Sequence, residues 1–144
     1  MKHDSYSDRY LKKVLKNART IAVVGASTDK NRPSYGVMRY LIGEGYRVIP
    51  VNPDHAGKEI LGQTVTASLA DIDGPVDMLD IFRRPDAVPD VIREAIEHKE
   101  RLGLKSIWMQ LGIRDDKVAA EAEAAGLNVV MDRCPAIERP QLGL

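Results

Sequence analysis

Short apolar runs alternate with longer amphipathic segments along most of the chain. Runs rich in β-branched residues predict five strands, at residues 20–24, 46–51, 75–82, 104–109 and 127–131. Between them, apolar positions recur at helical spacing and predict helices at residues 34–44, 85–102 and 114–125. The strand runs are apolar almost throughout, which is typical of a parallel sheet covered on both faces.

The alternation of strands and helices indicates right-handed crossovers between parallel strands. We therefore expect an α/β fold, a Rossmann-like, doubly wound parallel sheet of five strands. An amphipathic segment at residues 7–18 predicts an extra N-terminal helix before the first strand. Residues 54–75 read as a loop, with a short strand near 59–60 and a short helical piece near 68–72.

The most informative loop follows the first predicted strand. The apolar run ends at Gly25, passes through a small polar loop and reaches a helix start near Pro33 and Ser34. Backbone N–H groups at such a turn and helix N-terminus favour an anion, usually a phosphate. The dinucleotide fingerprint G-x-G-x-x-G would need two further glycines, where the chain has Ser27 and Lys30. The loop thus predicts a phosphate-bearing nucleotide and makes NAD the weaker candidate.

Ligands of doubly wound sheets lie beyond the carboxyl ends of the strands, so the loops after the strands hold the candidate site. In the first loop, the small residues Ala26 and Ser27 let a ligand approach the backbone, and Arg32 could contact a phosphate. After the second strand, Asn52 and Pro53 replace the carboxylate that usually binds an NAD ribose. This uncharged end would tolerate a phosphorylated ribose, although Asn-Pro is also a plain turn sequence.

The remaining loops carry weaker candidates. Phe82 and Arg83 could stack on an adenine and meet a phosphate, or Arg83 could simply be solvated. Gln110 and the backbone of Gly112 could hydrogen-bond a polar ligand chain, whereas the nearby Trp108 is expected in the core. The lone Cys134 follows the last strand, where it is either reactive or a small buried apolar residue.

Composition narrows the classes of function. The 21 basic and 21 acidic residues balance, which argues against a nucleic-acid partner. The chain contains no apolar run of 18 residues, so we predict no membrane span. Its single cysteine fits a reducing, cytoplasmic setting. The three histidines lack metal-ligand spacing and no nucleophile motif occurs, so we predict neither a metal nor a catalytic residue.

We expect one domain over residues 1–144. Within it, residues 1–19 hold the N-terminal helix, residues 20–134 the nucleotide-binding core and residues 135–144 a C-terminal tail.

Taken in order, the loop motifs resemble those of the small stand-alone CoA-binding proteins, a family similar to the CoA-binding N-terminal domain of the succinyl-CoA synthetase α subunit. The motifs are Val24–Ser27, Arg32–Gly36, Gly45–Tyr46, Val48–Pro53, Asp80–Arg83, Trp108–Ile113 and Val130–Cys134. The match runs from about Thr20 to Cys134, which is most of the chain. Each motif is weak alone, but the ordered set is specific.

This resemblance implies a Rossmann-like domain that binds coenzyme A. The diphosphate would lie near Gly25, Ala26, Ser27 and Ser34, with Arg32 as a phosphate contact. Adenosine would lie near Asn52-Pro53 and Phe82-Arg83, and the pantetheine arm would pass Gln110, Gly112 and Ile113. Cys134 would lie near the ligand. The larger relatives add a ligase domain and a phosphorylated histidine without counterpart here, so synthetase activity is not implied.

The leading hypothesis is therefore a non-catalytic carrier, sensor or accessory module that binds CoA or an acyl-CoA. A small NAD(P)-dependent oxidoreductase is the alternative, and it would need a carboxylate on the second strand and an acid/base group. A third hypothesis is a subunit that senses CoA or redox state through Cys134. The sequence predicts a small-molecule ligand, no nucleic acid and no membrane, and leaves open a protein partner or a homo-oligomer.

Overall fold

Five parallel strands form the central sheet of the computed structural model, which describes residues 1–144. They are β1 (Thr20–Val24), β2 (Arg47–Val51), β5 (Met78–Ile81), β6 (Ser106–Met109) and β7 (Asn128–Val130). Their order across the sheet is β2-β1-β5-β6-β7, and every neighbouring pair is parallel. The predicted Rossmann-like α/β sheet is confirmed. The strand order reverses between β1 and β5, which is where such folds bind ligands.

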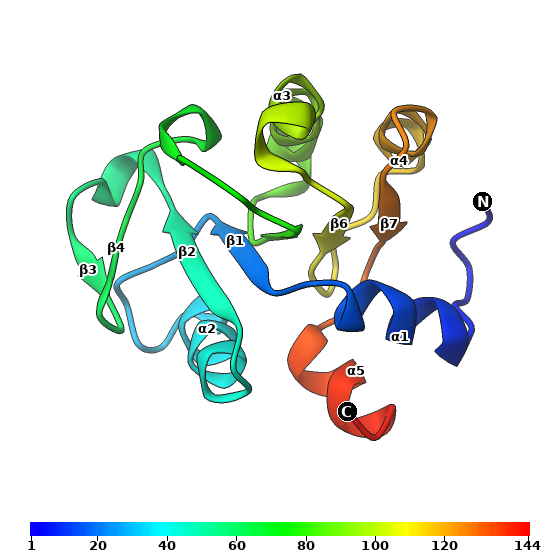
Figure 1. The fold of residues 1–144 in the computed structure, drawn as a ribbon, viewed down its shortest axis with the longest axis horizontal. Coiled ribbons are helices and arrows are strands. Elements are labelled where there is room, and N and C mark those ends of the chain that lie inside the picture. The colour runs from blue at the N-terminus through cyan, green and yellow to red at the C-terminus, as the bar shows by residue number, and fades with distance from the viewer.

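Helices cover both faces of this sheet (Figure 1). On one face lie α3 (Val88–Leu102) and α4 (Asp116–Ala124). On the other lie α1 (Asp8–Lys16), α2 (Pro33–Gly43) and α5 (Pro135–Gln141). Each face has its own buried apolar cluster, of 23 and 17 residues respectively. Two cores of this size explain why the strands are apolar on both sides, and the extra N-terminal helix is confirmed as α1.

The long segment between β2 and β5 forms a small unit beside the sheet. A hairpin of β3 (Glu59–Ile60) and β4 (Gln63–Thr64) is antiparallel and lies beyond β2 (Figure 1). Short 3₁₀ turns occur at η1 (Pro53–His55), η2 (Leu69–Asp71) and η3 (Pro85–Ala87). The predicted short strand and helical piece thus correspond to β3 and η2, while the pairing strand β4 was not predicted.

The C-terminal residues differ from the sequence expectation. The sequence predicts only a tail at residues 135–144, but the structure has helix α5 there, even with Pro140 inside it. Tertiary contacts hold this helix: the Arg139 guanidinium donates to the Tyr46 hydroxyl at 3.1 Å and to the Glu44 carboxylate at 3.0 Å. Such long-range contacts override a weak local helix preference.

The N-terminal segment protects the free edge of β7. The Tyr10 hydroxyl donates to the Val129 carbonyl at 2.7 Å and accepts from the Val129 N–H at 2.9 Å. The Tyr6 hydroxyl accepts from the Met131 N–H at 2.8 Å. An edge strand otherwise offers unpaired backbone groups to other chains. His3 is buried as well, with its imidazole 2.7 Å from the Tyr6 hydroxyl.

Candidate functional site

A cavity of about 510 Å³ opens at the carboxyl edge of the sheet, around the point where the strand order reverses. This volume lies within the range of small-molecule and cofactor pockets. Its wall consists of Gly25, Ser27, Arg32, Pro33, Ser34, Asn52, His55, Phe82, Gln110, Leu111 and Ile113. These residues come from the loops after β1, β2, β5 and β6 and from the first turn of α2. The pocket is therefore assembled from four segments that are distant in sequence.

Gly25 sits at the closest approach between two of these segments. Its φ of +88° lies in the left-handed region, which glycine adopts without strain. A Cβ atom there would lie 2.9 Å from the carbonyl carbon of Phe82 and closer still to its oxygen. Only glycine therefore lets the loop after β1 run against the end of β5.

Hydrogen bonds to β2 and to α2 fix the loop after β1. The N–H groups of Gly25 and Ala26 both donate to the Val51 carbonyl, at 2.9 and 3.3 Å. The Ser27 N–H donates to the Ser34 Oγ at 3.2 Å, and Ser34 is only 3 % exposed. Helix α2 begins at Pro33, which has no N–H, and the Tyr35 N–H donates to the Arg32 carbonyl at 3.0 Å, so the Ser34 N–H is the first-turn donor without a backbone partner. This end of the pocket therefore favours an anion.

The turn after β2 is built by one side chain. The Asn52 Oδ1 accepts from the Asp54 N–H at 2.9 Å, and its Nδ2 donates to the Ala26 carbonyl at 2.9 Å. Asn52 thus ties the end of β2 to the loop after β1 and starts the η1 turn. That turn brings His55 into the pocket wall, where its Nδ1 has no hydrogen-bond partner. No sequence pattern predicts that His55 belongs to the site.

The loop after β6 places the side-chain amide of Gln110 in the pocket wall. Gln110 is only 6 % exposed, and its Oε1 has no hydrogen-bond partner in the protein. The loop is fixed from outside, because the Gly112 N–H donates to the Asp132 Oδ1 at 2.7 Å. Trp108 is fully buried, as expected for a core residue, and its Nε1–H donates to the Arg133 carbonyl at 2.8 Å. The unpartnered Gln110 oxygen is thus held in place as an acceptor.

The structure brings most of the predicted site residues together. Eight of them line the pocket: Gly25, Ser27, Arg32, Ser34, Asn52, Phe82, Gln110 and Ile113. Pro53 and Arg83 line a neighbouring cavity of about 230 Å³ on the α3 side, together with Val51, Leu69 and Glu94. The pocket also includes three residues that were not predicted, namely Pro33, His55 and Leu111.

The three other predicted residues lie outside the pocket wall. Ala26 is fully buried behind the loop, and Gly112 is exposed with its N–H engaged by Asp132. Cys134 is the N-cap residue of α5, is only 6 % exposed and packs in the apolar cluster on the α1, α2 and α5 face. In this structure Cys134 is a core residue.

One buried acid lies beneath the site. Asp80, on the central strand β5, has no exposed surface, and neither carboxyl oxygen has a hydrogen-bond partner. Its register neighbours are Val23 and Trp108, both in the apolar cluster. Burial without a compensating charge raises the pKa of the Asp80 carboxyl well above its ordinary value. Folding therefore favours the neutral form of this acid.

Charge within the pocket wall comes from few groups. Arg32 is exposed and provides the one side chain of fixed charge, and His55 is the other titratable group.

No helix of the structure combines the length and the apolar character that a membrane span needs.

Comparison with known proteins identifies relatives along most of the chain. A family model described as CoA binding domain matches residues 19–140. An uncharacterized protein of Bacillus subtilis, YneT, is 35 % identical over 124 residues, which span 86 % of this chain and 87 % of that protein. A solved structure from Thermus thermophilus superposes with a TM-score of 0.87 at 42 % identity, covering 95 % of this chain and 99 % of that chain.

A larger relative contains the same region as a part. The α subunit of the ADP-forming acetate–CoA ligase I of Pyrococcus furiosus is 35 % identical over 82 residues. The match covers 54 % of this chain and only 18 % of the subunit, so the likeness concerns one portion of the ligase. With the family model spanning the sheet and every loop of the pocket, the chain belongs to the CoA-binding domain family.

Proposed function

We propose that the protein binds coenzyme A or an acyl-CoA through its phosphates in the pocket at the carboxyl edge of the sheet. One observation carries this proposal: a single cavity joins an anion-favouring helix start, a cation and an unpartnered buried amide. Coenzyme A has the matching parts, since a charged nucleotide end is joined to an arm that contains amides.

The charged end of the ligand fits the loop after β1. The first turn of α2 would bind the diphosphate beside the loop at Gly25 and Ser27, and Arg32 would neutralise part of its charge. The adenosine would lie toward Pro53 and Arg83, at the neighbouring cavity of about 230 Å³.

The other end of the pocket fits the pantetheine arm. The Gln110 Oε1 is a buried acceptor without a protein donor, and a pantetheine amide N–H would satisfy it. Phe82, Leu111 and Ile113 supply the apolar wall along which the methylene groups of the arm would pack. Leu111 is 55 % exposed at present and would lose contact with water on binding.

The protein acts as a carrier, sensor or accessory module rather than as an enzyme. The two serine side chains of the pocket both accept hydrogen bonds from backbone N–H groups, of Asp29 and Ser27 respectively, and neither contacts a base. A nucleophilic serine would need such a base within hydrogen-bond reach. The single, buried Cys134 supports a reducing compartment, the cytoplasm, as the place of action.

Isothermal titration with CoA, acetyl-CoA and NAD tests this function. We expect micromolar or tighter binding of CoA, and Arg32→Ala to weaken it about tenfold because a charge-assisted phosphate contact is lost. Arg84→Ala is the matched control, since Arg84 is exposed and belongs to neither cavity. Binding of NAD without binding of CoA would reject the proposal and favour the oxidoreductase.

A further inference from the structure

We infer that His55 recognises a phosphate on the 3′ position of the ligand ribose, so that the pocket selects 3′-phosphorylated adenine nucleotides. This inference rests on the proposed function and makes it more specific, because it separates coenzyme A from its dephospho form. It assigns a role to a residue that sequence patterns did not single out.

His55 lies at the position in the fold that normally contacts the ribose. In doubly wound sheets, the end of the second strand of the nucleotide-binding unit contacts the ribose, usually through a carboxylate that binds its hydroxyl groups. Here that strand is β2, and the turn after it places His55 in the pocket wall. Asp54, the carboxylate of this turn, is exposed and lies outside the wall. A carboxylate at this position would bind ribose hydroxyl groups but repel a phosphate. In this protein an imidazole takes its place, and it does not repel a phosphate.

Hydrogen bonds fix the turn that carries His55. Both polar atoms of Asn52 are engaged, by the Asp54 N–H and by the Ala26 carbonyl, so Asn52 builds the turn and is not free to bind the ribose. The backbone of His55 is also fixed, because its N–H donates to the Asn52 carbonyl at 3.2 Å and its carbonyl accepts from the Lys58 N–H at 3.0 Å.

The imidazole of His55 can also donate a hydrogen bond to a phosphate. Its Nδ1 is buried without a partner in the protein, whereas its Nε2 makes no hydrogen bond in the protein and can donate to a phosphate oxygen when it carries a proton. The one side chain of fixed charge in the wall is Arg32, at the start of α2. The pocket therefore offers two separate sites for anions, Arg32 with the start of α2 for the diphosphate and His55 for a third phosphate.

The test is a comparison of two ligands by isothermal titration, coenzyme A and 3′-dephospho-coenzyme A. For the wild-type protein we expect coenzyme A to bind about tenfold more tightly, the effect of one hydrogen bond to a charged group. His55→Ala should remove this preference by weakening coenzyme A about tenfold while leaving the dephospho ligand nearly unchanged. His55→Gln, which keeps a donor, should retain part of the preference.

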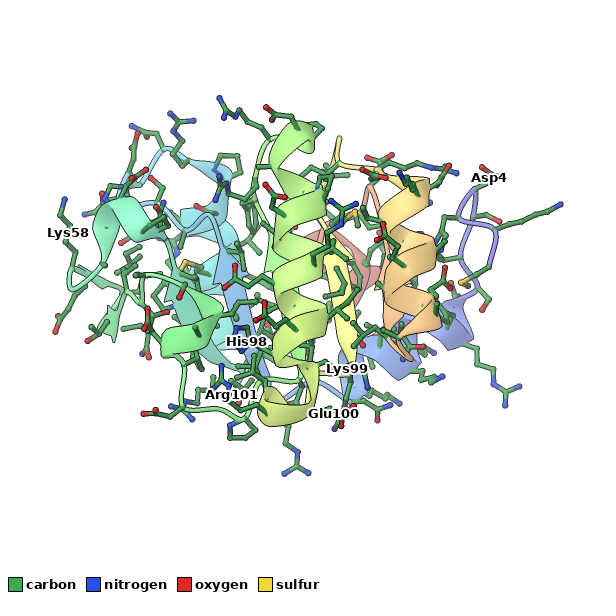
Figure 2. The ribbon with its side chains drawn as sticks, turned by 90° about the horizontal axis from the view of Figure 1, so that it is seen from above. Asp4, Lys58, His98, Lys99, Glu100 and Arg101 are labelled. Carbon is green, nitrogen blue, oxygen red and sulfur yellow. The ribbon has the colours of Figure 1, made fainter.

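His98→Ala is the matched control. His98 is on α3 with its Nδ1 3.3 Å from the Arg101 guanidinium, near the end of the helix where the Arg101 label lies (Figure 2). It lines none of the cavities at the site, so the preference should survive. A second readout is the ³¹P resonance of the 3′-phosphate, which should shift on binding to the wild type and much less with His55→Ala.

The possible failures can be told apart. A wild-type protein that binds neither ligand would reject the proposed function. A wild-type protein that binds both ligands equally would overturn the role of His55 alone. The same conclusion follows if His55→Ala keeps the tenfold preference or weakens both ligands to the same degree.

Discussion

Replacement of Gly25 by alanine tests how closely the loop after β1 packs against the end of β5. The φ of +88° costs an alanine about 1–2 kcal/mol, because a Cβ atom is disfavoured in the left-handed region. The added Cβ would also lie 2.9 Å from the carbonyl carbon of Phe82, a backbone atom that cannot rotate away. Forcing these segments apart adds about 1–3 kcal/mol, the usual cost of overpacking. We therefore expect Gly25→Ala to lower the free energy of unfolding by about 2–5 kcal/mol.

Gly45→Ala separates the two contributions. Gly45 has a φ of +93°, so it carries the same conformational cost, but nothing lies within 4 Å of its added Cβ. Urea unfolding of both variants should show Gly25→Ala to be less stable by about 1–3 kcal/mol. Gly25→Ala should also weaken CoA binding, whereas Gly45→Ala should not, because Gly45 lies outside the pocket wall. Equal stability losses in the two variants would refute the close approach of the backbone to Phe82.

Other predictions address the buried acid, the free strand edge and the loop after β6. Burial raises the pKa of Asp80, so the folded protein retains a proton that the unfolded chain loses above about pH 4. As the pH rises from 4 to 6, urea unfolding should show wild type losing stability relative to Asp80→Asn, by at most about 1.4 kcal/mol per pH unit. Parallel pH profiles would contradict this. Tyr10→Phe removes both hydrogen bonds to Val129 and should cost about 1–3 kcal/mol in the same assay, and an unchanged midpoint would count against the capped edge. Asp132→Ala frees the Gly112 N–H and should weaken CoA binding several-fold in calorimetry, whereas Asp132→Asn keeps an acceptor and should bind nearly as wild type. Equal affinities of the two Asp132 variants would reject a positioning role for this side chain.

The sheet and most of the pocket could be predicted from the sequence for a simple reason. Buried parallel strands need apolar residues on both faces, so β1 and β5 stand out as apolar runs bounded by turn residues. Once the strands are known, the fold itself places their carboxyl ends together. Gly25 and Gln110 could therefore be assigned to one site although 85 positions separate them in the sequence.

The parts that could not be predicted depend on long-range side-chain contacts. His55 enters the pocket only because Asn52 bonds at once to the Asp54 N–H and to the Ala26 carbonyl. The Asn-Pro-Asp sequence after β2 signals a turn but not its direction. Likewise, nothing in the periodicity near His3 indicates that its imidazole is buried at 2.9 Å from the Glu123 carboxylate.

The direction of the Cys134 side chain also could not be predicted from the sequence. A cysteine just after the last strand of such a sheet lies at the ligand edge, which is why it was a candidate for contact with CoA. The structure turns the chain into α5 at this residue and packs the thiol in the apolar cluster. Its position along the chain was informative, but the direction of its side chain depended on the unpredicted helix.

The most direct test of CoA binding at this pocket is an NMR titration that follows the backbone amides of the protein as CoA is added. We predict saturable shifts confined to the loops after β1, β2, β5 and β6, the first turn of α2 and the wall of the neighbouring cavity of about 230 Å³, with the largest changes at Ser27, Ser34 and Gln110. A separate cavity of about 600 Å³ near His3 and Arg114 should stay unaffected. Shifts centred on the cavity near His3, or no saturable shifts at all, would contradict the account.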